Sequence, residues 1–299
     1  MTVPGPPPGE TGAIHDIGYR HYDGPRLGSA YIARSLFLHS LRGAFGVGRS
    51  VRSKVTPLLL LAVMVVPALI IVAVAVITNA NDLPLEYTSY AVRLQVVVTV
   101  FVAAQSPQSV SHDLRFRVVP LYFSRPLTRT AYVQAKLLAM SAALFGLLAV
   151  PLLVLYAGAL LAEMPLWSNT RDVALALVGA ALLAVVLASF GLVVAAFTPR
   201  RGLGVAAVVA VLLVLAAVAA VVQGVASDEG NTTVAGWAGL ISPFSLVDGV
   251  QVWALGAESS AQEAPPGTYG GPVFAAAAAA LVAACYGLLM LRYRRVSLS

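Results

Sequence analysis

Long apolar stretches constrain this sequence more than any other feature. The first, Pro57–Thr78 (PLLLLAVMVVPALIIVAVAVIT), contains no charged residue. A helix rises about 1.5 Å per residue and the hydrocarbon layer of a bilayer is about 30 Å thick, so about 20 apolar residues are enough to cross it. Five further stretches reach or approach this length: about 90–110, 137–161, 173–197, 203–222 and 272–291. We therefore predict an all-α integral membrane protein with six transmembrane helices.

Composition supports this fold class and excludes others. Of the 299 residues, 59% are apolar and 11% are charged, and the mean hydropathy is +0.85. A water-exposed surface needs more charge than this, so a soluble globular enzyme is disfavoured. A disordered chain would need low hydrophobicity and high charge. The single cysteine, Cys285, leaves no basis for a disulfide framework or a Cys-rich zinc site.

The charged residues predict the orientation of the spans. Lys and Arg in short segments beside transmembrane helices stay on the cytoplasmic side. With six spans, 17 of the 19 basic residues fall on the side of the two termini, and nine of the 13 acidic residues fall on the other. We therefore expect both termini in the cytoplasm. The net charge of +6 is then a topology signal, and we predict no nucleic-acid partner.

The segment before the first span divides into two parts. Residues 1–28 form a predicted extended cytosolic tail, whose His15, Asp16, His21 and Asp23 lack a rigid element to hold a metal, so we predict no metal site. Residues 29–56 contain a helix of about 30–45, capped by Ser29, and its lead-in to the span. Ser35, His39 and Arg42 share one face of this helix, and Arg34 falls on its apolar side. It is either an interfacial helix along the inner leaflet or a plain juxtamembrane anchor.

The predicted second span carries a polar stripe. Gln95, Thr99 and Ser106 fall within a narrow arc of a helical wheel. Polar groups in lipid are costly, so the stripe faces either a translocation path or a neighbouring helix that it hydrogen-bonds. Both interpretations remain open from the sequence.

The loop between the second and third spans alternates basic and apolar residues. It reads HDLRFRVVPLYFSRPLTRTAYVQAK from His112 to Lys136, with Thr130 as a candidate cap for the third span. Exposed aromatic residues among basic ones suit a protein-docking surface, and a basic loop also suits anionic lipid headgroups.

A long outer segment of about 223–271 precedes the sixth span. Trp237–Gly256 is apolar but is broken by Pro243 and is too short to cross. We predict one or two short re-entrant helices here, with Ser245 and Asp248 as a capping box for a helix ending near Leu255.

Motifs for nucleotide binding and hydrolysis are absent from the sequence. It contains no G-x-x-x-x-G-K-[ST], no H-E-x-x-H and no G-x-S-x-G. We therefore predict that this chain has no cofactor of its own and breaks no bond itself. Seventeen Arg against two Lys, with abundant Ala, Val and Gly, is typical of a GC-rich bacterial genome, so we expect the bacterial cytoplasmic membrane as its location.

The arrangement resembles a type-2 ABC exporter permease subunit. The resemblance covers the chain from about Ser29 and is carried by the interfacial helix, the loop 113–136 (DLRFRVVPLYFSRPLTRTAYVQAK) and ISPF at 241–244 before the sixth span. The loop is similar to the family's coupling loop, although Val118 and Val119 replace its usual Gly-Thr.

The resemblance implies a half-transporter. Two copies of the chain would form the pore, each docking one copy of a cytosolic ATPase that binds ATP and magnesium and drives export of a hydrophobic or amphiphilic substrate. The implied docking residues are His112, Asp113, Leu114, Arg115, Phe116 and Arg117, with help from Arg34, His39 and Arg42, and the implied path residues are Gln95, Thr99 and Ser106. Membrane lipids would surround it. A lipid-modifying membrane enzyme and an ATPase-linked scaffold or regulator are the alternatives.

Overall fold

The computed structural model describes residues 24, 27–48, 50–78, 82–110, 113, 122, 127–198, 200–261 and 263–296. Over these residues the protein is all-helical, without β-strands. Five helices of the described chain are long and apolar enough to cross a membrane, which indicates a multi-pass membrane protein. They are α2 (Val51–Thr78), α7 (Arg129–Leu161), α8 (Leu166–Phe197), α9 (Arg201–Asp228) and α12 (Gly267–Val296). Each contains one of the predicted stretches and extends beyond it at one or both ends.

The predicted second span is interrupted. It consists of α3 (Tyr90–Arg93) and α4 (Gln95–Ser109), with a break at Leu94. The 15 residues of α4 reach only about 22 Å, less than the hydrocarbon thickness, so this segment is not among the five. Tyr90 is buried and its hydroxyl donates a hydrogen bond to the Met64 carbonyl of α2 (2.5 Å), which fixes α3 against the first span.

The predicted outer helices are present as a bent pair. Helix α10 (Thr232–Ala238) and helix α11 (Pro243–Leu255) meet at 114°, and the count of spans becomes six if this pair is taken as one. The break falls at 239–242, directly before Pro243, which has no backbone N–H and occupies the first position of α11.

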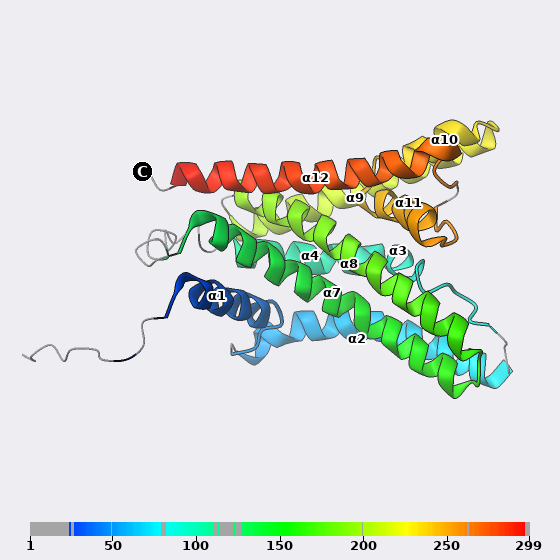
Figure 1. Ribbon diagram of the computed structural model, residues 1–299, viewed down its shortest axis with the longest axis horizontal. Coiled ribbons are helices and arrows are strands. Elements are labelled where there is room, and N and C mark those ends of the chain that lie inside the picture. Colours follow the sequence, from blue (N-terminus) through cyan, green and yellow to red (C-terminus); the bar gives the residue numbers. More distant parts are fainter. Residues whose placement is uncertain are drawn as a thin grey trace, which may run out of the picture.

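The two central helices of the bundle are α7 and α8, which pack along each other. Helix α2 packs on α7, α9 packs on α4, and α11 and α12 pack on α8 (Figure 1). More than half of the central positions of α7 and α8 are buried, against less than a quarter in α2, α9 and α12. The three outer helices therefore keep apolar faces that suit lipid or a partner.

The first and last helices of the described chain reach the same end of the bundle. Helix α1 (Ser29–Ala44), the start of α7 and the C-terminal end of α12 lie there, and we call it the α1 end (Figure 1). Helices α3, α10 and α11 lie at the opposite end, which we call the α11 end. Since α2 runs toward the α11 end and α7 starts at the α1 end, the chain returns toward the α1 end along α3 and α4.

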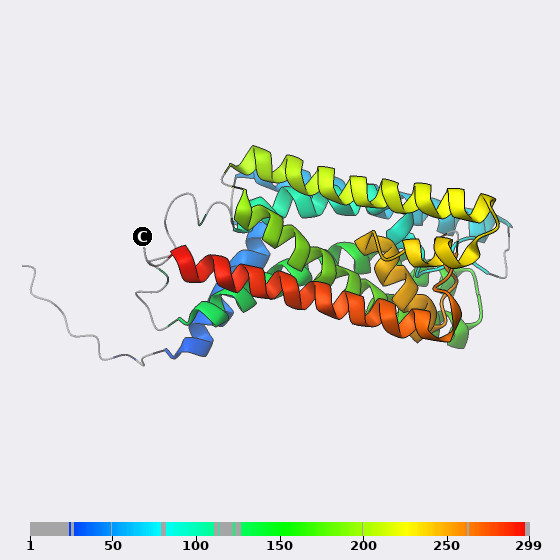
Figure 2. The same ribbon diagram turned by 90° about the horizontal axis from the view of Figure 1, so that it is seen from above.

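Helix α1 runs across the bundle rather than along it (Figure 2). Its buried Leu36 packs on the core, and the Phe45 ring that follows it lies 6.1 Å from the Phe101 ring of α4. This placement matches the predicted boundaries of about 30–45.

The three predicted caps are wrong. Gly28, not Ser29, is the N-cap of α1; Thr128, not Thr130, caps α7 by accepting from the Ala131 N–H; and Ser242, not Ser245, caps α11 by accepting from the Phe244 N–H. Each helix begins one to three residues before its predicted start. Caps depend on local backbone angles, which residue type alone does not determine.

Candidate docking site at the α1 end

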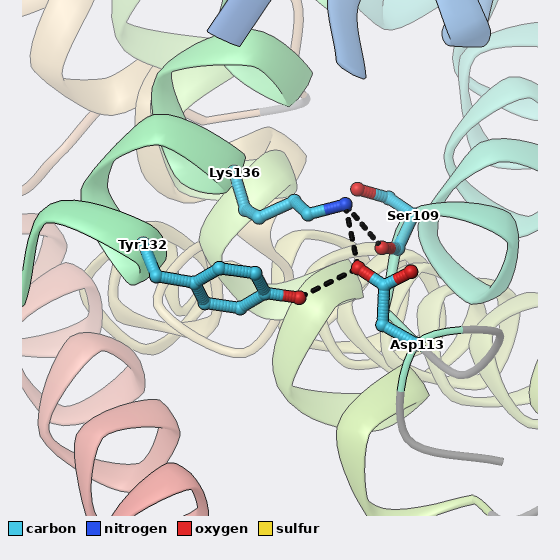
Figure 3. A network of polar contacts seen from close by, with 4 residues as sticks. All are labelled: Ser109, Asp113, Tyr132 and Lys136. Atoms are coloured by element: carbon cyan, nitrogen blue, oxygen red, sulfur yellow. Dashed lines mark hydrogen bonds and ion pairs between the residues drawn. The ribbon is translucent and has the colours of Figure 1, made fainter. Parts of the chain in front are cut away.

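Asp113 is held against α7 at the α1 end of the bundle. Its side chain is buried, with 7% of the residue exposed. The Oδ2 atom lies 2.8 Å from Lys136 Nζ and accepts a hydrogen bond from the Tyr132 hydroxyl at 2.6 Å (Figure 3). Asp113 therefore fixes the connection between α4 and α7 to helix α7.

Helix α7 supplies both partners from one face. Tyr132 and Lys136 are four residues apart, so their side chains point the same way from consecutive turns. Lys136 Nζ also donates to the Ser109 carbonyl at 2.9 Å. Ser109 is the last residue of α4, where carbonyl groups lack hydrogen-bond partners within the helix. Lys136 therefore donates a hydrogen bond to one of these carbonyls and at the same time compensates the charge of Asp113.

Aromatic rings connect this cluster to α12, the last helix of the described chain. The Tyr132 ring lies 5.5 Å from the Tyr122 ring and 5.1 Å from the Tyr293 ring of α12, the latter edge-on. Burial, followed by the charge of Asp113, raises the pKa of Tyr122, which therefore stays neutral at physiological pH. The α4–α7 connection, α7 and α12 thus meet at Tyr132, and movement of any one must disturb the others.

The Asp113–Lys136 ion pair is almost completely shielded from solvent. Lys136, like Asp113, is only 7% exposed. Removing one member of such a pair leaves a buried charge without compensation, which costs more than the pair itself contributes. The ion pair therefore disfavours any arrangement of the loop in which Asp113 and Lys136 are separated.

Of the six predicted docking residues in the loop, Asp113 alone is described. Its carboxylate is turned inward onto α7, so it anchors the loop and does not face a partner. The other five predicted loop residues lie outside the described residues: His112, Leu114, Arg115, Phe116 and Arg117.

The predicted docking residues of α1 lie on its exposed face. Arg34, His39 and Arg42 are all exposed, including Arg34, which the helical pattern placed on the apolar side, whereas Leu36 is buried. His39 also lines a cavity of about 190 Å³ between α1, α4 and α7. The exposed cations of α1 and the anchored loop are therefore brought to one end of the molecule.

The predicted path residues have different surroundings. Thr99 and Ser106 are fully buried inside a single copy, and their hydroxyl groups have no hydrogen-bond partner in the described structure. At Gly191 of α8, a Cβ atom would lie 2.5 Å from Ser106 Oγ, so α4 and α8 approach closely at this glycine. Gln95 is half-buried at the start of α4.

The α11 end has a larger cavity, of about 600 Å³, between the residues before α3, the start of α8 and the loop after α11. Tyr87 and Asn169 form its buried wall, with the Tyr87 hydroxyl donating to Asn169 Oδ1 at 2.9 Å. Nearby, Asp248 is 2% exposed and accepts hydrogen bonds from Ser259, Ser260 and Ala261. It thus shapes the loop after α11 and does not cap that helix as predicted.

Sequence reasoning missed the contacts that organise the α1 end. Lys136 and Asp113 were both noticed as parts of one motif, but their pairing was not. The spacing of Tyr132 and Lys136 on one helical face was the available signal. Nothing local indicates that Tyr293, from the last helix, joins them.

No group of three or more His, Cys, Asp or Glu that could hold a metal occurs among the described residues. His15, Asp16, His21 and Asp23 lie outside them. The sequence matches no protein-family model and no curated protein.

Proposed function

We propose that this chain is the membrane permease subunit of an ATP-driven exporter, with ATP hydrolysed by a separate cytosolic ATPase that docks at the α1 end. In this proposal two copies of the chain assemble in the cytoplasmic membrane of a bacterium. The substrate is hydrophobic or amphiphilic, such as a drug, an antibiotic or a lipid.

The observation that carries the proposal is the anchor at Asp113. A loop that passes force to the helices must be fixed to them firmly, or its displacement would be lost in local bending. The ion pair and the hydrogen bond tie the loop to α7, and α7 contacts most of the bundle. A displacement of the loop is therefore transmitted to α7 and through it to α8, which a switch between two packed states of the bundle requires.

Topology gives independent support. The exposed cations Arg34 and Arg42 lie at the same end as the anchored loop. Basic residues favour the cytoplasmic side, which is where an ATPase and its ATP are found. In this proposal the chain makes six passes, with α3 and α4 together as the second, and both termini are cytoplasmic.

The absence of nucleotide-binding and nucleophile motifs from the sequence favours a separate energy source over a lipid-modifying enzyme or a self-contained pump. The apolar walls of the bundle suit an apolar substrate. Of the three residues of the polar stripe, Gln95 at the start of α4 is half-buried, so its side chain can contact a substrate without any separation of the helices.

The direct experiment is co-purification with an ATPase that carries a Walker A motif, sought first in the reading frames next to this gene. Arg115→Ala removes a predicted contact, and Asp113→Ala releases the anchor. We expect Arg115→Ala to weaken the complex and Asp113→Ala to uncouple ATP turnover from transport. Glu229→Ala, an exposed acid at the α11 end, is the matched surface control.

Complex formation and ATP turnover at wild-type levels in both variants would contradict the docking assignment. An ATPase that never co-purifies with the wild-type chain would favour the lipid-modifying enzyme. An ATPase that binds without any transport would favour a scaffold or regulator. Gln95→Leu with unchanged transport would remove Gln95 from the path.

A further inference from the structure

The cavity of about 190 Å³ at the α1 end is built mostly from hydrogen-bond donors and small apolar residues. It lies between α1, which crosses the bundle, and the ends of α4 and α7. In a membrane, the end of a spanning bundle lies at the depth of the lipid headgroups. The twelve lining residues include three apolar ones, Ala44, Ala139 and Met140.

One buried polar group in this cavity lacks a partner. The Ser40 hydroxyl of α1 is buried and has no hydrogen-bond partner within the described part of the chain. Buried polar groups are normally satisfied, because leaving one unpaired costs about 1–3 kcal/mol. Gln105 of α4 is only 5% exposed and lines the same space, so one occupant can accept hydrogen bonds from both side chains.

The hydrogen-bond donors of the cavity favour a ligand that accepts hydrogen bonds. Lys136 uses two of its three N–H donors on Asp113 and the Ser109 carbonyl, which leaves one for a ligand. Asp113, the one carboxylate of the lining, is already engaged by Lys136 and Tyr132. His39 adds a ring N–H at the exposed side. An ammonium, an amide, a hydroxyl and an imidazole together match the oxygen atoms of a phosphate group.

We propose that this cavity binds the phosphate of a membrane-lipid headgroup, with Gln105, Ser40 and Lys136 as its hydrogen-bond donors. The volume holds a phosphate and its first carbon atoms, so the acyl chains stay outside. A bound lipid joins α1 to α4 and α7 beside the Asp113 anchor. The proposal goes beyond the transport function and needs no ATPase.

The test uses the full-length purified chain in detergent, stripped of lipid, and native mass spectrometry to measure binding. Three probes are compared: dioleoylphosphatidylglycerol, dioleoylglycerol, which lacks the phosphate, and inorganic phosphate alone. We expect one tightly bound phosphatidylglycerol per chain and weaker binding of dioleoylglycerol. Gln105→Leu and Ser40→Ala should each weaken binding of the phospholipid by roughly tenfold, the effect of losing one hydrogen bond to a charged group.

Gln223→Leu is the matched control, because Gln223 is an equally buried glutamine that lies in α9, outside the cavity. It should bind phosphatidylglycerol like the wild type. Ser40→Ala removes a single atom, so it still tests the site if Gln105→Leu fails to fold.

Equal binding of both lipids, or unchanged binding in Ser40→Ala and folded Gln105→Leu, would overturn the proposal and leave a cavity filled by water. Inorganic phosphate that binds as tightly as phosphatidylglycerol would overturn the proposal that the ligand is a lipid. The cavity would then be a site for free phosphate.

Discussion

Two buried aspartates tie connecting segments to helices at opposite ends of the molecule, and they do so with different chemistry. Asp113 at the α1 end is neutralised by Lys136 and receives the Tyr132 hydroxyl. Asp248 at the α11 end receives one hydroxyl and two backbone N–H groups, all from residues 259–261, and has no cation among its partners in the described structure.

The difference lies in what each aspartate joins. Asp248 binds residues that follow it by 11 to 13 positions, so it shapes a local turn after its own helix. Asp113 joins the α4–α7 connection to α7 and, through Tyr132, to Tyr293 at the end of α12. A charge-compensated anchor between separate segments suits an end that transmits motion, whereas a local anchor without a cation suits an end that keeps its shape.

The largest effect is expected from Lys136→Met. It leaves the Asp113 carboxylate buried without a cation, and breaking a buried pair in this way costs about 3–5 kcal/mol. Denaturant unfolding of the purified chain should show this loss. Lys54→Met replaces the chain's other lysine, which is only half-buried, and should cost less than about 1 kcal/mol.

The double variant Asp113→Leu/Lys136→Met sharpens this prediction. It removes both charges, so it should recover most of the stability lost in Lys136→Met. A single variant as stable as the wild type would mean that solvent reaches the pair and that the anchor is weak.

Asp248→Ala should have the next largest effect. It leaves three buried or half-buried donors without an acceptor, and we expect a loss of about 2 kcal/mol together with faster hydrogen exchange at Ser260 and Ala261. Asp248→Asn keeps an acceptor oxygen and should lose about half as much.

The corresponding change at the other end, Asp113→Asn, leaves Lys136 uncompensated and should be worse than Asp248→Asn. Equal losses in the two asparagine variants would remove the contrast between the ends.

The sequence was sufficient to predict the helices that depend on apolar length alone. Pro57–Thr78 lies inside α2, and the other long stretches lie inside α7, α8, α9 and α12, because about 20 apolar residues in a row have few alternatives to a membrane helix. The amphipathic segment before them became α1 within one residue of its predicted bounds.

The tertiary contacts could not be predicted in the same way. Asp113 and Lys136 are far apart in sequence, and the same residues fit a surface loop equally well until the helices are placed. The contact between Tyr90 and α2 beside the break at Leu94 is again a tertiary contact. Two cap predictions failed because several neighbouring Ser and Thr residues could each serve, and the third because Gly28, the residue before Ser29, is the N-cap of α1.

Gly191→Ala tests how closely α4 and α8 pack near the α1 end. The added Cβ would lie 2.5 Å from both Ser106 Oγ and Val102 Cγ1, so a neighbour must move, and such overpacking costs about 1–3 kcal/mol. Gly202→Ala meets no atom within 4 Å and should be neutral or slightly stabilising. Thermal unfolding in detergent separates the two. An unaffected Gly191→Ala would mean that α4 and α8 part easily, which would expose Ser106 as the path interpretation requires.

The smallest effect at neutral pH concerns Tyr87, the counterpart of Tyr132 at the α11 end. Tyr132 donates to a charged carboxylate, whereas Tyr87 donates to the neutral amide oxygen of Asn169. A hydrogen bond between neutral groups contributes about 1 kcal/mol, so Tyr87→Phe should lose about that much at pH 7. Burial, followed by the charge of Asp172 and the neighbouring Tyr156, raises the pKa of Tyr87 to about 12.

The raised pKa of Tyr87 gives the same variant a second readout at high pH. In the unfolded chain a tyrosine ionises near pH 10, so the protonated, folded form is favoured fully below pH 10 and loses this advantage as the pH rises toward 12. Wild-type stability should therefore fall over that interval by more than the stability of Tyr87→Phe. Difference ultraviolet titration of the two proteins isolates this one phenol. Ionisation near pH 10 in the folded protein would show that the α11 end admits water to Tyr87, and the contrast between an α11 end that keeps its shape and an α1 end that transmits motion would then fail.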